Sequence, residues 1–266
     1  MIDLKNSRKT LIGMIHAGAL PGTPSNHLSI RELTDQAVKE AEIYLSHGID
    51  SILVENMHDV PYLKNYVGPE IVASMTAICV EIRKLTRKPL GIQILAGANK
   101  EALAVAQAAS FEYIRAEGFV FGHLADEGFM ESCAGELFRY RKAIGAEDIA
   151  VYTDVKKKHS SHAVTADISL EETISAAEFF LSNGIIITGL ATGKEASVEE
   201  VKKAANITKL PVIVGSGITA ENISAYWDFA DAFIVGSYFK KEGNWQNSVD
   251  PQRVSLLMEM VRMLRQ

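Results

Sequence analysis

The chain has 266 residues and a formal net charge of −6, and 47% of its residues are hydrophobic. A single (β/α)₈ barrel typically needs about 250 residues, so we expect one domain over residues 1–266. Lysines and arginines are scattered along the chain and form no stripe, which predicts that nucleic acid is not a partner. No apolar run approaches the ~18 residues of a membrane span, so we expect no membrane-spanning segment.

Two features of the sequence predict a cytoplasmic protein. The first residues, 1–7, lack the charged start and the apolar segment of a secretion signal. Cys79 and Cys133 stand far apart and outside any CxxC spacing, so we interpret them as small apolar residues and not as a disulfide or zinc ligands.

Short β-rich segments alternate with helical patterns along the whole chain. The predicted strands are 11–16, 51–55, 90–95, 111–116, 149–154, 185–188, 212–214 and 232–235. Ser-x-x-Glu spacings that begin at Ser29, Ser169 and Ser197 predict capped starts of three helices between them. Residues 250–264 predict a last helix on the outside. This alternation favours a closed parallel (β/α)₈ TIM barrel over an open sheet.

Two connections are longer than a strand-to-helix loop needs, at residues 117–131 and 155–168. Active sites of such barrels lie at the carboxyl ends of the strands. Extra length at that end commonly supplies lids or binding groups, so we expect these loops to border the site.

The last two predicted strands each lead into a glycine-containing turn. Their sequences are VIVGSGIT at 212–219 and AFIVGS at 232–237. Two such turns can present backbone N–H groups to one phosphate, which predicts a phosphorylated small-molecule ligand. The candidate phosphate ligands are Gly215, Ser216, Gly217, Gly236 and Ser237. The alternative is that these glycines only make tight turns.

A further loop at 187–194, ITGLATGK, follows the sixth predicted strand. Its threonines and glycines suit a segment that wraps a ligand, and we include Thr188, Thr192 and Gly193 among the candidate binding residues. A plain connecting loop is the alternative.

Polar residues collect at the ends of the predicted strands and in the loops that follow. A buried carboxylate or imidazole needs a partner, a ligand or water, so this density favours a functional site. Gln93 has a purely structural alternative, which is that it only hydrogen-bonds neighbouring backbone. Arg115 has one too, which is that it only pairs with Glu117 or Glu55. The candidate catalytic residues are Asp154, Glu55, His16, Lys158, Arg115, Asn56 and His159.

Among these candidates, Asp154 or Glu55 is the expected general base, and His16 or Lys158 the acid or electrostatic stabiliser. Arg115 is expected to bind an anionic or hydroxyl group. A Schiff-base lysine is a weaker alternative. His159 and His162 with Asp154 offer ligands for a divalent metal, but their spacing matches no zinc signature, so we assign no metal ligand and leave the cofactor open.

Together these segments resemble the BtpA/SgcQ family of barrel proteins over nearly the whole chain. The resemblance implies a ribulose-phosphate-binding type of barrel, with a phosphorylated sugar or nucleotide-like ligand at the last two turns. In place of the histidine that family members often carry after the Asp-Val pair, this chain has Lys156, so a metal or proton-relay role is not carried over to that position. The matching segments are 13–16, 20–24, 55–61, 113–115, 126–128, 139–141, 154–155, 158–159, 188–193, 214–217, 234–236 and 249–253.

Two functions follow as hypotheses. The first is an enzyme of carbohydrate metabolism that acts on a phosphorylated sugar or ribosyl compound, by isomerisation or glycosidic-bond cleavage. The second is a non-catalytic assembly or regulatory factor, because one photosynthetic member of the family is associated with photosystem I accumulation. Barrels host many functions, so the fold alone does not decide between them. A homo-oligomer is expected on general grounds.

Overall fold

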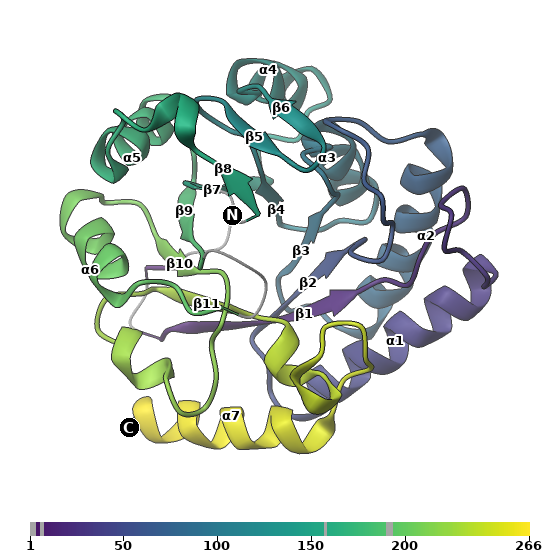
Figure 1. Ribbon diagram of the computed structural model, residues 1–266. Helices are drawn as coiled ribbons and strands as arrows, with labels where there is room; N and C mark the ends of the chain where they lie inside the picture. Colours follow the sequence, from purple (N-terminus) through teal and green to yellow (C-terminus); the bar gives the residue numbers. More distant parts are fainter. Residues whose placement is uncertain (1–3, 6–7, 157–158, 190–193) are drawn as a thin grey trace.

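Eight parallel strands close into a barrel, which Figure 1 shows along its axis. The computed structural model describes residues 4–5, 8–156, 159–189 and 194–266. Each of the eight strands lies within two residues of its predicted bounds, so the predicted TIM barrel is confirmed. The barrel strands are β1 (Thr10–His16), β2 (Ser51–Glu55), β3 (Leu90–Gln93), β4 (Tyr113–Ala116), β7 (Ala150–Asp154), β9 (Gly184–Ile187), β10 (Val212–Val214) and β11 (Ala232–Val235).

The barrel closes because β1 pairs with both of its neighbours. Thr10 is in register with Ala232 of β11, and His16 is in register with Glu55 of β2. All strands run in the same direction, so their carboxyl ends meet at one mouth. The polar residues that end the strands are thereby brought to that mouth.

Side chains that alternate along the strands divide the core in two. One set fills the inside of the barrel, where Leu4 from the N-terminal segment packs with Met14, Leu53 and Tyr152. Close packing there leaves no room for a side chain at residue 91, since a Cβ on Gly91 would come 2.1 Å from the Tyr113 ring. The other, larger set lies between the strands and the surrounding helices.

Helices surround the barrel, and their starts follow the predicted spacing. Ser29 and Ser169 form reciprocal capping boxes with Glu32 and Glu172, whereas at Ser197 the side chain accepts from the backbone N–H of Glu200. Only a 3₁₀ turn, η2 (Ile223–Tyr226), lies between β10 and β11 in place of an α-helix. The α-helices are α1 (Ile30–Ser46), α2 (Pro69–Leu85), α3 (Asn99–Ala108), α4 (Ala134–Ala143), α5 (Leu170–Phe179), α6 (Val198–Ile207) and α7 (Pro251–Leu264).

The two long loops fold against each other at the mouth. The first contains the hairpin of β5 (His123–Ala125) and β6 (Gly128–Met130), and the second contributes β8 (Ser160–Ser161) to the same antiparallel sheet in the order β6-β5-β8. Leu124 is in register with Ser161 across the two loops. The added length therefore forms one small sheet, seen near β4 and β7 in Figure 1.

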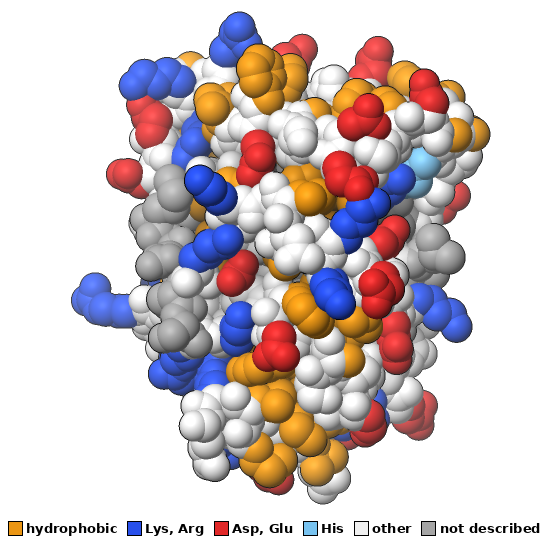
Figure 2. Space-filling model, turned by 90° about the vertical axis from the view of Figure 1, so that its left-hand side faces the viewer, with side chains coloured by type: hydrophobic (Ala, Val, Ile, Leu, Met, Phe, Trp, Pro, Cys, Tyr) orange, Lys and Arg blue, Asp and Glu red, His pale blue; other side chains and the backbone are white. Residues whose placement is uncertain are grey.

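The outer surface carries charges of both signs. Figure 2 shows lysine and arginine side chains interspersed with aspartate and glutamate over the face that includes α5 and α6, with hydrophobic side chains exposed between them. Among the described residues, no helix has the length and apolar character needed to cross a membrane. The expected cytoplasmic location and homo-oligomer stay predictions.

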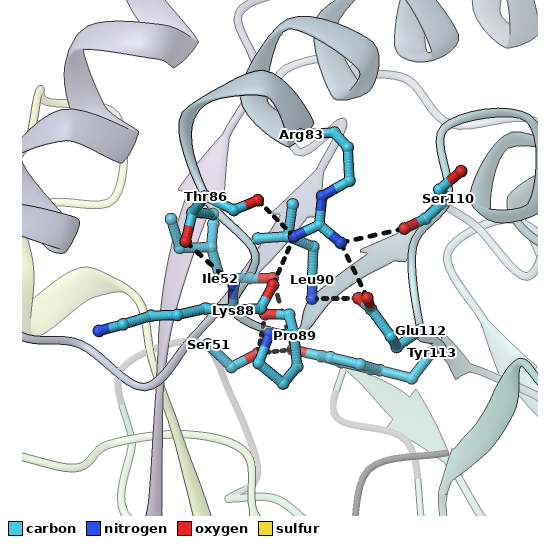
Figure 3. Close-up of polar contacts among 10 residues, drawn as sticks. All are labelled: Ser51, Ile52, Arg83, Thr86, Lys88, Pro89, Leu90, Ser110, Glu112 and Tyr113. Atoms are coloured by element: carbon cyan, nitrogen blue, oxygen red, sulfur yellow. Dashed lines mark hydrogen bonds and ion pairs between the residues drawn. The ribbon is translucent and has the colours of Figure 1, made fainter.

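Arg83 ties α2 to the amino-terminal ends of two strands, at the opposite end of the barrel from the mouth (Figure 3). Its Nη1 donates to the carboxylate of Glu112 at 2.8 Å and to the carbonyl of Ser110 at 3.1 Å, while Nη2 donates to the carbonyls of Thr86 and Lys88. Glu112 in turn accepts from the backbone N–H of Leu90 at 2.8 Å. One guanidinium therefore satisfies several backbone acceptors.

We expect Arg83→Ala to lower the free energy of unfolding by about 2–3 kcal/mol, because it leaves partly buried acceptors without a donor. Urea unfolding monitored by circular dichroism measures the change. Lys84→Ala is the matched control. Lys84 pairs with Glu81 on the surface and with no other carboxylate among the described residues, so its loss should change stability by less than about 0.5 kcal/mol. Equal losses in the two variants would contradict this account of the Arg83 network.

Candidate functional site

A cavity of about 170 Å³ opens at the carboxyl ends of β1, β2, β10 and β11. We call it the Gly217 cavity. It lies between the two glycine turns that the sequence singles out, and it also reaches residues from β2 and β4. Its lining includes His16, Glu55, Met57, Arg115, Gly215, Ser216, Gly217, Thr219, Gly236, Ser237, Tyr238 and Arg253.

The turn after β10 packs tightly against the loop that precedes α6. Gly217 has a φ of +69°, and a Cβ there would come 2.5 Å from the backbone of Glu195. The Ser216 hydroxyl accepts from the N–H of Gly189 at 2.6 Å and donates to the carbonyl of Lys194 at 3.0 Å. Packing alone therefore explains why residue 217 is glycine, and the Ser216 side chain is already used within the protein.

Backbone donors of both turns remain for a ligand. In the part of the chain that the structure describes, the N–H groups of Ser216, Gly217, Ser237 and Tyr238 make no hydrogen bond. All four residues line the Gly217 cavity. Unpaired donors directed at one concave site are the usual arrangement for binding an anion.

Arg253 adds a positive charge to this cavity, and the sequence did not predict it. It lies in the first turn of α7, where its Nε donates to the carbonyl of Tyr238 and its guanidinium lies 4.5 Å from the centre of the Tyr238 ring. Within the described residues, its two terminal nitrogens make no hydrogen bond. These contacts fix the guanidinium while leaving a fork of donors for an anion.

His16 and Glu55 lie close together beside the turns. His16 Nε2 lies 3.7 Å from Glu55 Oε2, and both side chains are almost fully buried. The Nδ1 atom lies 3.1 Å from the carbonyl of Trp245, and because a carbonyl only accepts, Nδ1 carries a proton. The other ring nitrogen, Nε2, faces Glu55.

Gly236 places this pair next to the second turn. A Cβ on Gly236 would lie 3.3 Å from His16 Nε2, which is closer than ordinary van der Waals contact. The lack of a side chain thus lets the imidazole lie against the turn after β11. The turns and the His16–Glu55 pair thus share one cavity.

Arg115 pairs with Asp154, so neither Glu117 nor Glu55, the partners considered from the sequence, is its hydrogen-bonded partner. Its Nη2 donates to Asp154 Oδ1 at 3.0 Å, and its Nε donates to Oδ2 at 3.2 Å. Burial opposes the charge of Arg115, but the carboxylates of Asp154 and Glu55 outweigh this and raise the pKa of the guanidinium. Of these two paired residues, only Arg115 lines the Gly217 cavity.

Asn56 is buried and positions neighbouring backbone. Its Nδ2 donates to Asp59 Oδ2 at 2.8 Å, and its Oδ1 accepts from the N–H of Leu95 at 2.7 Å. Asp59 also accepts from the N–H of Leu20, and burial raises its pKa despite both hydrogen bonds. These contacts hold the loops after β1, β2 and β3 together.

The other candidate residues lie at the edges of the site or outside the residues that the structure describes. Thr188 follows β9 directly and donates to the carbonyl of Lys156 at 3.2 Å. His159 lies at the mouth near Glu55, on the wall of a second cavity. Gln93 is 1% exposed, and its Oε1 has no hydrogen-bond partner among the described residues. Lys158, Thr192 and Gly193 lie outside the described residues.

No group of three or more His, Cys, Asp or Glu residues is placed to hold a metal ion within residues 4–5, 8–156, 159–189 and 194–266. The ring of His162 lies 5.5 Å from that of His123 in the loop sheet.

The amino-acid sequence matches the family model described as the BtpA family over residues 7–263. The chain belongs to the BtpA family. It is 48% identical to the mitochondrial protein F13E9.13 of Caenorhabditis elegans, over 98% of this chain and 96% of that protein. It is 34% identical to the photosystem I biogenesis protein BtpA of Synechocystis, over 94% of this chain and 86% of that protein.

Solved structures similar to this BtpA-family chain share its fold. The thiamine phosphate pyrophosphorylase of Pyrococcus furiosus superposes with a TM-score of 0.60 at 14% identity, covering 98% of this chain and 99% of that one. The N-(5'-phosphoribosyl)anthranilate isomerase of the same organism gives a TM-score of 0.59 at 14% identity, with coverage of 96% and 99%. At this identity, the likeness establishes the barrel fold and no activity.

Because Arg115 and Asp154 are buried together, removing one leaves an uncompensated charge. We expect Asp154→Leu to lower the free energy of unfolding by about 3–5 kcal/mol, and Arg115→Met/Asp154→Leu to recover most of that loss. Urea unfolding of both variants and of Arg115→Met completes the cycle. Additive losses would show that the pair is not coupled.

Proposed function

We propose that this protein is an enzyme that acts on a phosphorylated sugar or ribosyl compound. The observation that carries the proposal is that one cavity holds both the unpaired backbone donors of two turns and the His16–Glu55 pair. Several hydrogen-bond donors and titratable side chains gathered in one cavity of a barrel mouth are typical of a site for small-molecule chemistry.

We assign the phosphate to the turns Gly215–Gly217 and Gly236–Ser237. The positive charge of Arg253 would compensate the negative charge of the phosphate. Backbone N–H groups and a bidentate guanidinium are the donors that suit phosphate oxygens. Arg115 also faces the cavity, but Asp154 balances its charge, so we assign it to a hydroxyl or carbonyl group of the sugar.

Glu55 is the general base that the geometry favours, because it lines the cavity and faces His16 Nε2. In an isomerisation, its carboxylate would take a proton from the carbon beside a carbonyl while His16 Nε2–H protonates the carbonyl oxygen. In a glycosidic cleavage, Glu55 would activate a water for attack on the sugar carbon while His16 protonates the leaving group. Asp154 then acts by positioning Arg115.

The alternative is a non-catalytic assembly factor. It is supported by the name of the Synechocystis relative, a photosystem I biogenesis protein. This alternative would be favoured if the protein bound a phosphorylated compound but turned over none of the compounds tested below.

A thermal-shift panel of inorganic phosphate, sugar phosphates and nucleoside phosphates tests the anion site. A ligand present at a hundredfold excess over its Kd stabilises the folded state by about 2.7 kcal/mol, which raises the melting temperature. We expect Arg253→Gln to weaken the binding at least about tenfold, since a hydrogen-bonded charge is removed, and Ser237→Asp to abolish it by charge repulsion. Arg262→Gln on the same helix is the control and should bind normally. Unchanged binding in Arg253→Gln and Ser237→Asp would place the phosphate elsewhere.

A turnover assay on the compounds that bind tests the acid–base pair. We expect Glu55→Gln to lower kcat by at least about 100-fold, because it removes the base, while Kd for inorganic phosphate stays the same. Proton exchange with solvent at a sugar carbon identifies an isomerase, and release of a reducing sugar phosphate identifies glycosidic cleavage. A Glu55→Gln variant with unchanged kcat would remove Glu55 from the chemistry.

A further inference from the structure

Residues 240–249, between β11 and α7, form a loop at the barrel mouth (Figure 1, yellow, beside α1). We call it the 240–249 loop. Its ends pair through an isolated antiparallel bridge between Lys240 and Val249. Gly243 lines the Gly217 cavity, and Trp245 lines the second cavity at the mouth. The loop is therefore closed at its base and borders the candidate site.

Hydrogen bonds inside the 240–249 loop fix its shape. The side-chain Nδ2 of Asn247 donates to the carbonyl of Lys241 at 3.0 Å, and the N–H of Asn247 donates to the carbonyl of Asn244 at 3.0 Å. The Oδ1 of Asn244 accepts from the N–H of Gln246 at 3.1 Å. Because these bonds enclose Trp245, we expect it to move together with the base of the loop.

One carboxylate on α1 holds both ends of this loop. Glu40 Oε2 accepts from Lys240 Nζ at 2.6 Å, and Glu40 Oε1 accepts from the N–H of Val249 at 3.0 Å. The side chain of Lys240 is only 1% exposed, so its charge depends on this partner. Both oxygens of Glu40 are used at the base of the loop, and the place of the loop on α1 depends on this one side chain.

The middle of the loop contacts His16. The carbonyl of Trp245 accepts from His16 Nδ1 at 3.1 Å, and the two rings meet edge to face with their centroids 6.2 Å apart. The opposite nitrogen, Nε2, lies 3.7 Å from Glu55 Oε2. A ring nitrogen that donates to a carbonyl keeps its proton, so the contact with Trp245 selects the tautomer of the neutral ring.

We propose that Glu40 is a positioning residue for His16. Acting through the 240–249 loop, it holds the carbonyl of Trp245 at Nδ1, keeps the proton of the neutral ring there, and directs Nε2 toward the Gly217 cavity. Nε2 is then the nitrogen that gains and loses a proton during turnover. Orienting a catalytic histidine through its second nitrogen is a general device. The inference rests on the proposed function, in which His16 is the acid, and adds to it a residue that does not line the Gly217 cavity.

The ¹⁵N signals of the His16 ring test this positioning without a substrate. In protein labelled with ¹⁵N-histidine, at a pH above the pKa of the ring, long-range ¹H–¹⁵N correlations distinguish Nδ1–H from Nε2–H, and His16→Gln assigns the signals. We expect Nδ1–H in the wild type. In Glu40→Leu/Lys240→Met, which removes both tethers and leaves no buried charge alone, the ratio of Nδ1–H to Nε2–H should fall at least about fivefold, because the hydrogen bond that favours Nδ1–H is weakened. Asn247→Ala, which loosens the loop from within, should lower the same ratio by less.

Activity and stability separate positioning from a merely structural role. In Glu40→Leu/Lys240→Met we expect kcat to fall at least about tenfold, while the melting temperature stays near that of the wild type and Kd for inorganic phosphate is unchanged. Glu42→Gln, an exposed carboxylate on the same helix, is the control and should change neither the tautomer ratio nor kcat.

Two results would overturn the inference. One is Nε2–H as the tautomer of His16 in the wild type, and the other is a wild-type tautomer ratio in both Glu40→Leu/Lys240→Met and Asn247→Ala. A changed ratio with unchanged kcat would instead remove His16 from the chemistry. That result would overturn the proposed function and leave in place the tether from Glu40 to the His16 ring.

Discussion

The pairing of β1 with both β2 and β11 is the constraint on which the site depends. It closes the barrel, and its register sets His16 beside Glu55 on one side and beside the turn at Gly236 on the other. Residues from opposite ends of the chain thereby share one cavity. A slip of one residue would turn His16 away from the mouth, because successive side chains of a strand point to opposite faces.

Buried charges at the mouth are compatible with folding because each has a partner. Arg115 is held by Asp154, and Lys240, which is 1% exposed, is held by Glu40 at 2.6 Å. Glu40 also accepts from the N–H of Val249, so both ends of the loop that carries Trp245 are fixed to α1. Burial lowers the pKa of Lys240 while Glu40 opposes the shift. This ion pair positions Trp245 at the mouth.

Periodicity was enough to predict the barrel. Strands and helix caps are set by local patterns, so the eight strands and the capping boxes at Ser29 and Ser169 could be predicted from the sequence. The small sheet could not, because β8 has two residues and exists only through its contact with β5. Likewise, no local pattern shows that a 3₁₀ turn replaces the helix between β10 and β11.

The candidate site was predicted in part. Strand ends identified His16, Glu55 and Arg115, but the partner of Arg115 depends on the register between β4 and β7, which one sequence does not show. Arg253 and Trp245 come from segments after the last strand that fold back over the mouth, so no strand-end pattern marks them. The signal in the sequence that could have indicated Arg253 was an arginine in the first turn of the last helix, α7.

A crystal structure of the protein with bound ribose 5-phosphate tests the central claim most directly, that one ligand joins the two glycine turns to the His16–Glu55 pair. The account predicts phosphate oxygens within hydrogen-bond distance of the N–H groups of Gly217 and Ser237 and of the Arg253 guanidinium, with the sugar directed toward Glu55. Phosphate bound outside the Gly217 cavity, or a sugar directed away from Glu55, would contradict it.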